Sequence, residues 1–346
     1  MRGAVYYGVD DVRLEDIEEP IPGPGQVKIK VAFNGLCGTD LHEIFDAQRA
    51  VPASPHPLTG VQAPVVLGHE IAGTVTGVGA GVEGSMVGKL VAVEPILGCG
   101  SCAWCSSGHV NLCDRLAFHG LSTGGGGLAE YTVVPQSMLH VAPPGLTPQE
   151  VAVAEPLAVA WHAVERSGVA GGQTAAVLGA GAIGIGISLV LRSRGIKAVV
   201  VEPSPSRRRL VEGLGATVLD PSSGDAVDRL LELTSGAGVD VCFETSAAVA
   251  SYEVAVSSTA KHGVVMLLAS PRLPLPPVLG KALARELEIR TSYAYHGDFP
   301  AVLDALSRAL IPLDGWVTTA GLSSLHQVLA DMRAGSRAKV LIDPSY

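Results

Sequence analysis

The stretch TAAVLGAGAIGIGISLVLRSRG, residues 174–195, decides the fold of the second half of the chain. Residues 175–178 form a short apolar run typical of a buried strand, and residues 183–194 have the pattern of a helix. The turn between them has the spacing G-x-G-x-x-G, in which glycines allow a tight bend and the close approach of a pyrophosphate. The free N–H groups at the start of the following helix can bind the phosphates. The candidate cofactor-binding residues of this turn are Gly179, Gly181, Ala182, Ile183 and Gly184.

A lone Gly-rich turn is weak evidence, but the next segment supports the prediction. KAVVVE, residues 197–202, reads as a second strand that ends at Glu202, eighteen residues after Gly184. A carboxylate at this position binds the adenosine ribose hydroxyls and repels a 2′-phosphate, which favours NAD over NADP. Arg207 and the two arginines after it could instead clamp a 2′-phosphate, although a solvated first turn of the next helix is the preferred interpretation. Arg207 is retained as a candidate cofactor-binding residue.

Further strands alternate with helical segments in the second half. VDVCFETS, from residue 239, and HGVVMLLAS, from residue 262, read as strands of this kind. The alternation predicts a doubly wound parallel sheet over roughly residues 148–290. The first half instead has short β-rich runs broken by Gly and Pro, without helix–strand alternation. The predicted fold class is therefore α/β, with a doubly wound parallel sheet and a separate β-rich domain.

Composition excludes several functional classes. The 346 residues carry a net charge of −9 with no long run of one sign, which argues against nucleic acid as the main partner. The N-terminus lacks a basic start followed by an apolar run, so no secretory signal is predicted. Apolar stretches are broken well before the roughly 20 residues that a membrane-spanning helix needs. We therefore expect a soluble cytoplasmic protein with reduced cysteines.

Four of the six cysteines fall in CGSCAWCSSGHVNLC, residues 99–113. The spacing C-x2-C-x2-C-x7-C suits a closed tetrahedral zinc site. A ferredoxin-type iron–sulfur run ends C-x3-C-P, whereas the last gap here is seven residues and Asp114 follows it. Disulfides remain the alternative for an oxidising compartment. A closed site offers no position for substrate, so this loop is predicted to have a structural role. Its candidate zinc ligands are Cys99, Cys102, Cys105 and Cys113.

Three residues elsewhere are of the types that form a catalytic zinc site: Cys37, His69 and Glu155. Three protein ligands and one water make an open site, which can bind a substrate. Each residue also has an ordinary structural explanation, as a buried thiol, a hydrogen-bonded histidine or a carboxylate at a helix N-terminus. Their occurrence together with a zinc loop and a dinucleotide turn favours the catalytic interpretation.

Together these motifs resemble the zinc-dependent medium-chain alcohol and polyol dehydrogenases. GLCGTDLH, PVVLGHEIAGTV, the four-cysteine loop, AEPLAVAW and GAGAIG occur in that order, and they span essentially the whole chain. The resemblance implies a GroES-like catalytic domain over 1–147, a Rossmann NAD-binding domain over 148–290 and a return to the catalytic domain over 291–346. It also implies a homo-oligomer, either dimer or tetramer, with the Pro-rich segment 270–280 near the expected contact.

The resemblance also assigns roles to individual residues. The positions of its catalytic zinc ligands match Cys37, His69 and Glu155, Glu70 can join or replace a ligand, and Thr39 and His42 match the proton relay. Zinc is a Lewis acid and lowers the pKa of a bound hydroxyl, so that a hydride can pass to NAD. Thr39 would take the hydroxyl proton and pass it, through the nicotinamide ribose, to His42 and solvent, and histidine is a residue type suited to proton transfer near neutral pH.

One branch of the family is most similar. The Pro-rich insert between Cys37 and His69 and the segment AFHGLSTGGGGLAEY, residues 117–131, resemble (R,R)-2,3-butanediol dehydrogenases, also called acetoin reductases. The implied reaction is the NAD-linked oxidation of a vicinal diol to an α-hydroxyketone, and its reverse. A sorbitol-type polyol dehydrogenase or a biosynthetic alcohol dehydrogenase would share every ligand named. A zinc-stabilised structural protein could keep the cysteine loop, but it would have no reason to keep the relay and the second ligand set.

Overall fold

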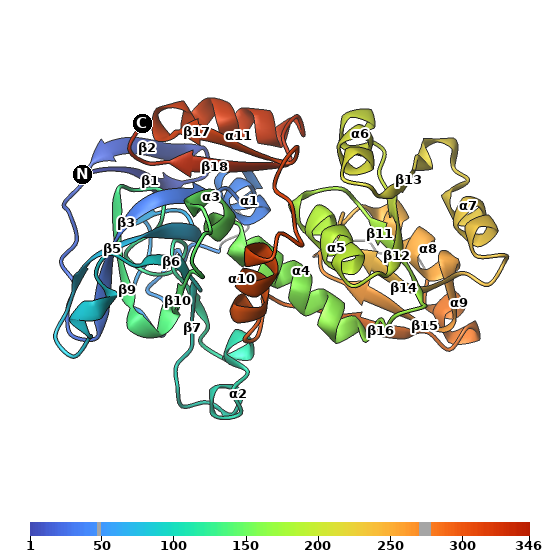
Figure 1. Ribbon diagram of the computed structural model, residues 1–346, viewed down its shortest axis with the longest axis horizontal. Helices are drawn as coiled ribbons and strands as arrows, with labels where there is room; N and C mark the ends of the chain where they lie inside the picture. Colours follow the sequence, from blue (N-terminus) through green and yellow to red (C-terminus); the bar gives the residue numbers. More distant parts are fainter. Residues whose placement is uncertain (47–49, 270–277) are drawn as a thin grey trace. The chain divides into compact units, whose positions relative to one another are not determined.

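The computed structural model describes residues 1–46, 50–269 and 278–346, so most of the segment 270–280 lies outside the described residues. The chain forms two compact units (Figure 1). The first contains Met1–Glu155, Phe299–Ala309 and Val317–Tyr346, and the second contains Pro156–Asp298 and Leu310–Trp316. The chain thus crosses between units after Glu155, Asp298, Ala309 and Trp316. The first two crossings lie eight residues beyond the expected domain boundaries, and Leu310–Trp316 lies in the second unit although the expected return to the catalytic domain was continuous.

The first unit is built around a mostly antiparallel sheet. In spatial order its strands are β10 (Leu139–Val141), β6 (Leu90–Val93), β5 (Glu70–Val78), β3 (Gln26–Gly35), β18 (Lys339–Asp343) and β17 (Val317–Gly321), while β9 (Tyr131–Pro135) pairs with β3. A smaller sheet contains β2 (Asp11–Asp16), β1 (Arg2–Gly8) and β4 (Val65–Val66). Alternate residues of β3, namely Val27, Ile29 and Val31, are buried in the core between the strands, as the period of two requires. In the register, Gly35 lies opposite Glu70 on β5 and opposite Leu341 on β18.

Helices close the first unit and position its loops. They are α1 (Gly38–Asp46), α2 (Ala103–Ser106), α3 (Pro148–Ala152), α10 (Phe299–Ser307) and α11 (Leu325–Arg333). Helix α3 starts with a capping box, because the Thr147 side chain accepts from the Glu150 backbone and Glu150 accepts from the Thr147 backbone. Helix α11 buries Leu325, Val328 and Leu329, an amphipathic spacing that turns one helix face to the core. The chain's last segment is therefore part of the core of the first unit.

The second unit contains a six-stranded parallel sheet. Its strands are β13 (Thr217–Leu219), β12 (Lys197–Val201), β11 (Thr174–Leu178), β14 (Val239–Glu244), β15 (Thr259–Leu267) and β16 (Glu288–Thr291). The connecting helices are α4 (Ala154–Ser167), α5 (Ala182–Ser193), α6 (Pro205–Gly213), α7 (Ala226–Leu233), α8 (Val249–Ser258) and α9 (Leu279–Ala284). The strand order reverses between β11 and β14, and such a switch point is where a doubly wound sheet binds its nucleotide. The predicted fold class is confirmed.

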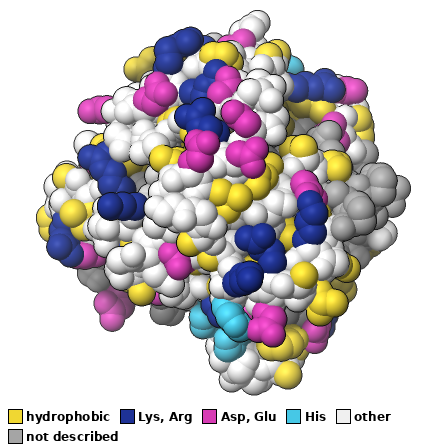
Figure 2. All heavy atoms as spheres, turned by 90° about the vertical axis from the view of Figure 1, so that its right-hand side faces the viewer, with side chains coloured by type: hydrophobic (Ala, Val, Ile, Leu, Met, Phe, Trp, Pro, Cys, Tyr) yellow, Lys and Arg dark blue, Asp and Glu magenta, His cyan; other side chains and the backbone are white. Residues whose placement is uncertain are grey.

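The surface has no segregation of charge on the face drawn in Figure 2. There Lys and Arg side chains are interspersed with Asp and Glu side chains. Across the described residues, no helix combines the length and apolar character needed to span a bilayer.

Candidate catalytic and metal-binding sites

The four-cysteine loop forms a compact lobe of the first unit. Strands β7 (Ile96–Leu97) and β8 (Ala117–Phe118) pair antiparallel and close its base. The four sulfur atoms of Cys99, Cys102, Cys105 and Cys113 lie within 4.8 Å of one another. Zinc–sulfur bonds of about 2.3 Å place tetrahedral sulfurs about 3.8 Å apart, so small adjustments complete the cage. Backbone N–H groups point at the sulfurs, as from Cys99 to Cys113 at 3.2 Å and from Cys102 to Cys99 at 3.3 Å.

The electrostatics of the lobe also fit a bound dication. Hydrogen bonds from the backbone and hydroxyl of Ser101, with that from Cys102, lower the pKa of Cys99 to about 5. Burial raises the pKa of Cys105 to about 12. The Cys99 thiol therefore loses its proton more readily than the Cys105 thiol, and a bound dication would favour the thiolate form of both. All four protein positions are filled by sulfur, which leaves no place for a substrate.

A second cluster in the same unit brings Cys37, His69 and Glu70 together, with ligand atoms within 4.8 Å of one another. The β3–β5 register explains this, because Cys37 follows the end of β3 and His69 directly precedes β5. Asp40 orders the cluster by accepting a 2.9 Å hydrogen bond from the Cys37 backbone N–H. His69 Nδ1 and Asp40 Oδ1 are buried, lie 3.5 Å apart and have no hydrogen-bond partner in the described part of the chain.

The second cluster favours positive charge. Burial lowers the pKa of His69, but the Asp40 carboxylate and the Cys37 sulfur raise it more, so the net pKa lies well above the usual value. Thiolate, imidazole and carboxylate are the ligand types that zinc takes in proteins. A bound dication would replace the proton on His69 and give its neighbours a charge partner, so these residues fit zinc.

Lys339, the first residue of β18, is not among the site residues that the motifs predict. Its ammonium group is buried and donates to both carboxylate oxygens of Glu70 and, at 2.9 Å, to the Leu36 carbonyl. Burial lowers the pKa of Lys339, but the Glu70 charge outweighs it and the net pKa is raised. Gly35 is required opposite, because a Cβ there would lie 1.9 Å from Glu70 Oε2. The Glu70 carboxylate is thus already neutralised, and metal binding by it would compete with this ion pair.

Glu155 has a different position from the other expected ligands. It is buried in the first turn of α4, and the set of ligand atoms within 4.8 Å among the described residues does not include it. Its charge nevertheless acts on Lys339 and helps to raise the pKa of that ammonium group. The structure therefore brings together Cys37, His69 and Glu70, and it places Glu155 close enough to Lys339 for their charges to interact.

The expected relay residues lie along helix α1. A 3.6 Å hydrogen bond joins Thr39 Oγ1 and Cys37 Sγ. His42 follows three residues later, and 40% of its side-chain surface is exposed. Its Nδ1 lies 2.8 Å from Asp46 Oδ2. Thr39 thus lies beside Cys37 of the second cluster, and the side chain of His42 is accessible to solvent.

The Gly-rich turn of the second unit has the conformation that its spacing predicts. Gly179 has φ of +104°, and a Cβ on Gly184 would lie 2.0 Å from the Gly179 carbonyl oxygen. Gly181 is the N-cap of α5, so the free N–H groups of this helix begin directly after it. The sequence of the turn therefore fits both its backbone and the close approach of α5 to β11.

Glu202 and the arginines after it have separate positions. Glu202 is buried and accepts backbone hydrogen bonds from Ala180 at 2.7 Å and Ser204 at 2.8 Å. Arg208 donates to the Glu202 carbonyl and forms an ion pair with Asp220, so it is not simply solvated. The Nε atom of Arg207 is buried without a partner among the described residues. Of these arginines, Arg207 has a donor left for a ligand.

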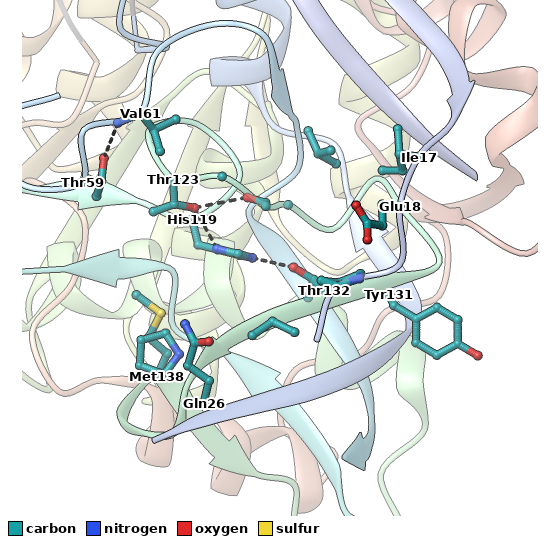
Figure 3. A pocket seen from close by; sticks show the side chains of 18 of the residues that line it. Ile17, Glu18, Gln26, Thr59, Val61, His119, Thr123, Tyr131, Thr132 and Met138 are labelled. Atoms are coloured by element: carbon teal, nitrogen blue, oxygen red, sulfur yellow. Dashed lines mark hydrogen bonds between the residues drawn. The ribbon is translucent and has the colours of Figure 1, made fainter. Parts of the chain in front are cut away.

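The first unit also contains a separate cavity of about 400 Å³, and His119, Thr123 and Thr132 are among the residues that line it. Figure 3 shows the His119 imidazole between the two threonine hydroxyls, with Nδ1 2.9 Å from Thr123 Oγ1 and Nε2 2.7 Å from Thr132 Oγ1. Burial lowers the pKa of His119 to about 4, so the ring is neutral at physiological pH. Because both ring nitrogens are used, His119 ties the Gly-rich loop beside it to β9.

Comparison with known proteins agrees with this architecture. Residues 23–144 match the alcohol dehydrogenase GroES-like domain, and residues 182–308 match the zinc-binding dehydrogenase family. The (R,R)-butanediol dehydrogenase of Bacillus subtilis is 37% identical over 323 residues, which are 92% of this chain and 91% of that protein. The crystal structure of 2R,3R-butanediol dehydrogenase from Bacillus subtilis has a TM-score of 0.92 at 36% identity, covering 99% of both chains. An Escherichia coli CFT073 alcohol dehydrogenase complexed with NADH has a TM-score of 0.90 at 26% identity, also covering 99% of both chains.

Proposed function

The chain belongs to the zinc-dependent medium-chain alcohol dehydrogenase family, and we propose that within it the protein interconverts a vicinal diol of the 2,3-butanediol type and its α-hydroxyketone with NAD. The observation that carries this proposal is the close pair of half-buried Cys37 and buried His69 beside Thr39, in a chain that resembles butanediol dehydrogenases over 92% of its length. The residues that would hold the metal, move the proton and bind the cofactor can each be assigned.

Cys37 and His69 hold the catalytic zinc in this proposal, and Glu155 is the third protein ligand. Glu70 stays with Lys339, because releasing it would leave a buried ammonium group without its charge partner, which is costly. The Asp40 carboxylate, 3.5 Å from His69 Nδ1, would orient the His69 ring, as outer carboxylates do for metal-bound histidines. Bound zinc supplies Lewis acidity, which lowers the pKa of a substrate hydroxyl.

Thr39 and His42 move the proton. Thr39 Oγ1 lies beside the Cys37 sulfur, so it can accept the substrate's hydroxyl proton and pass its own towards His42. His42 releases the proton to solvent, to which its side chain is open. Bound NAD would supply the acceptor for the hydride of the carbinol carbon, so that loss of the hydroxyl proton and of the hydride would convert the alcohol to a ketone.

The second unit binds NAD. The N-terminus of α5 would hold the pyrophosphate, and Gly181 at its N-cap leaves room there. The negative charge of Glu202 opposes a 2′-phosphate, and Arg207 contributes its free donor to the adenosine end. The four-cysteine lobe holds a second, structural zinc ion, so each chain carries two.

The same reasoning gives the expected state of the protein in the cell. We place it in the cytoplasm, where a reducing environment keeps the cysteines out of disulfides and able to bind zinc. We expect a homo-oligomer, either dimer or tetramer, because β16 is an edge strand of its sheet and carries the exposed Ile289. Light scattering coupled to size exclusion measures the number of chains, and a monomer would contradict this expectation.

The test of the proposed substrate is the initial rate of NADH oxidation with racemic acetoin, compared with that of NADPH. Protein with two zinc ions per chain should reduce acetoin rapidly with NADH and at least tenfold more slowly with NADPH. If acetoin is reduced with neither NADH nor NADPH, the proposed diol substrate is wrong, and sorbitol and other alcohols would be tested next. Equal rates with both cofactors would contradict the role of Glu202.

A further inference from the structure

We propose that Asp46 is a positioning residue for His42, holding its imidazole in the one tautomer that can accept the proton from Thr39. The proposal rests on the proposed function, in which His42 passes the proton from the active site to solvent. It adds a residue that neither the motifs nor the expected relay contains.

The geometry places these residues along one face of α1. Asp46 lies four residues after His42, and His42 lies three residues after Thr39, so successive side chains are one helical turn apart. Asp46 Oδ2 is 2.8 Å from His42 Nδ1, and Thr39 Oγ1 is bonded to Cys37 Sγ at the other end of the row. Thr39, His42 and Asp46 therefore lie along α1 from the second cluster to the end of the helix.

The chemistry of the pair fixes the proton positions. An ionised carboxylate only accepts hydrogen bonds, so Nδ1 of His42 must carry a hydrogen. A neutral imidazole has one N–H group, which makes Nε2 the nitrogen with a free lone pair. Nε2 then takes the proton that the relay delivers from Thr39, and the same N–H bond later breaks to release that proton to water. Asp46 keeps Nδ1–H throughout and does not itself change protonation.

The end of α1 also favours a positive charge on His42, because a helix C-terminus carries partial negative charge. When His42 holds two protons, its positive charge faces both Asp46 and this helix end. The arrangement thus stabilises the protonated intermediate of the relay.

The exposure of the pair makes the proposal testable without loss of the fold. The side chains of His42 and Asp46 are 40% and 45% exposed, and ion pairs this exposed contribute little to stability. A matched control exists in the second unit, where exposed His262 pairs with Glu286 at 3.1 Å. Glu286→Gln removes a histidine's carboxylate partner far from the relay in sequence.

The experiment combines kinetics with nuclear magnetic resonance on the zinc-loaded protein. For oxidation of (R,R)-2,3-butanediol with NAD, Asp46→Ala should lower kcat three- to tenfold, leave both KM values within twofold and cause no further loss in a His42→Gln background. Asp46→Glu should restore most of the lost kcat, and Glu286→Gln should match the wild type. Nitrogen-15 spectra should show the Nδ1–H tautomer of His42 in the wild type and a shift towards Nε2–H in Asp46→Ala.

The possible failures can be told apart. If His42→Gln alone keeps wild-type turnover, the proton route fails, and the role of Asp46 fails with it. If His42→Gln is slow but Asp46→Ala is fast, or if the tautomer does not change, the role of Asp46 alone is overturned. Losses that add in the double variant would likewise overturn it, because Asp46 would then act by a route other than His42.

Discussion

Lys339 and Glu70 form a buried ion pair in which each charge depends on the other. The Lys339 ammonium is 1% exposed and the Glu70 carboxylate 0%, so neither can be solvated by water if its partner is lost. Breaking such a pair from one side typically costs about 3–5 kcal/mol, whereas removing both charges costs far less. The pair also neutralises the charge of Glu70, the carboxylate of the second cluster.

We therefore expect Lys339→Met to lower the stability of the protein by about 3 kcal/mol or more. The double variant Lys339→Met with Glu70→Gln should recover most of this loss, because no unpaired charge remains. Urea unfolding measures both effects, and Arg308→Met, which breaks an exposed pair with Asp304, should change stability by less than about 1 kcal/mol. A double variant less stable than Lys339→Met would contradict the account.

The burial of His119 should make the free energy of unfolding depend on pH. Burial lowers its pKa to about 4, whereas the usual value of 6.5 applies to the unfolded chain. As pH falls from 6.5 to 4, the unfolded chain takes up a proton that the folded protein does not, so stability is lost in this window, by up to about 3 kcal/mol. His119→Gln should flatten the curve of unfolding free energy against pH over this range. The same change at exposed His262 should leave the curve unaltered, and an unaltered curve in His119→Gln would refute the prediction.

At the scale of elements, the turn between β11 and α5 leaves no room for a side chain at Gly184. An added Cβ would lie 2.0 Å from the Gly179 carbonyl oxygen, which would push α5 away from the strand and displace the N–H groups proposed to bind the phosphates. Gly184→Ala should weaken NADH binding at least tenfold, measured by fluorescence titration. Gly213→Ala in α6, where a Cβ meets nothing within 4 Å, should keep wild-type affinity. Equal affinities in the two variants would contradict this role of the turn.

The elements differ in how far the sequence predicts them. The parallel sheet is predictable because β11 and the Gly-rich turn carry local backbone requirements in their own residues. The pairing of β18 with β3 is not, since it joins residues about 300 positions apart and depends on the packing of the whole first unit. Lys339 was missed for that reason: a lysine at the start of an apolar strand gives no local indication that it will be buried.

The candidate sites follow the same division. The cysteine lobe is local, so its spacing predicts the four sulfurs that the structure brings together. The Cys37–His69 cluster requires the β3–β5 register, and only the resemblance to a family predicted it. The choice between Glu70 and Glu155 depends on Lys339, which the motifs do not include. His119 lies in a Gly-rich loop whose pattern does not reveal the burial of its ring.

For the whole molecule, the central claim is that one chain holds two zinc ions with separate roles. The most direct measurement is the zinc content per chain of three proteins, together with their acetoin reduction and thermal unfolding. The wild type should hold two zinc ions, and Cys37→Ser should hold one, unfold near the wild-type temperature and lose at least a thousandfold in rate. Cys113→Ser should also hold one, but with a clearly lower unfolding temperature. A single zinc ion in the wild type, or full activity in Cys37→Ser, would contradict the account.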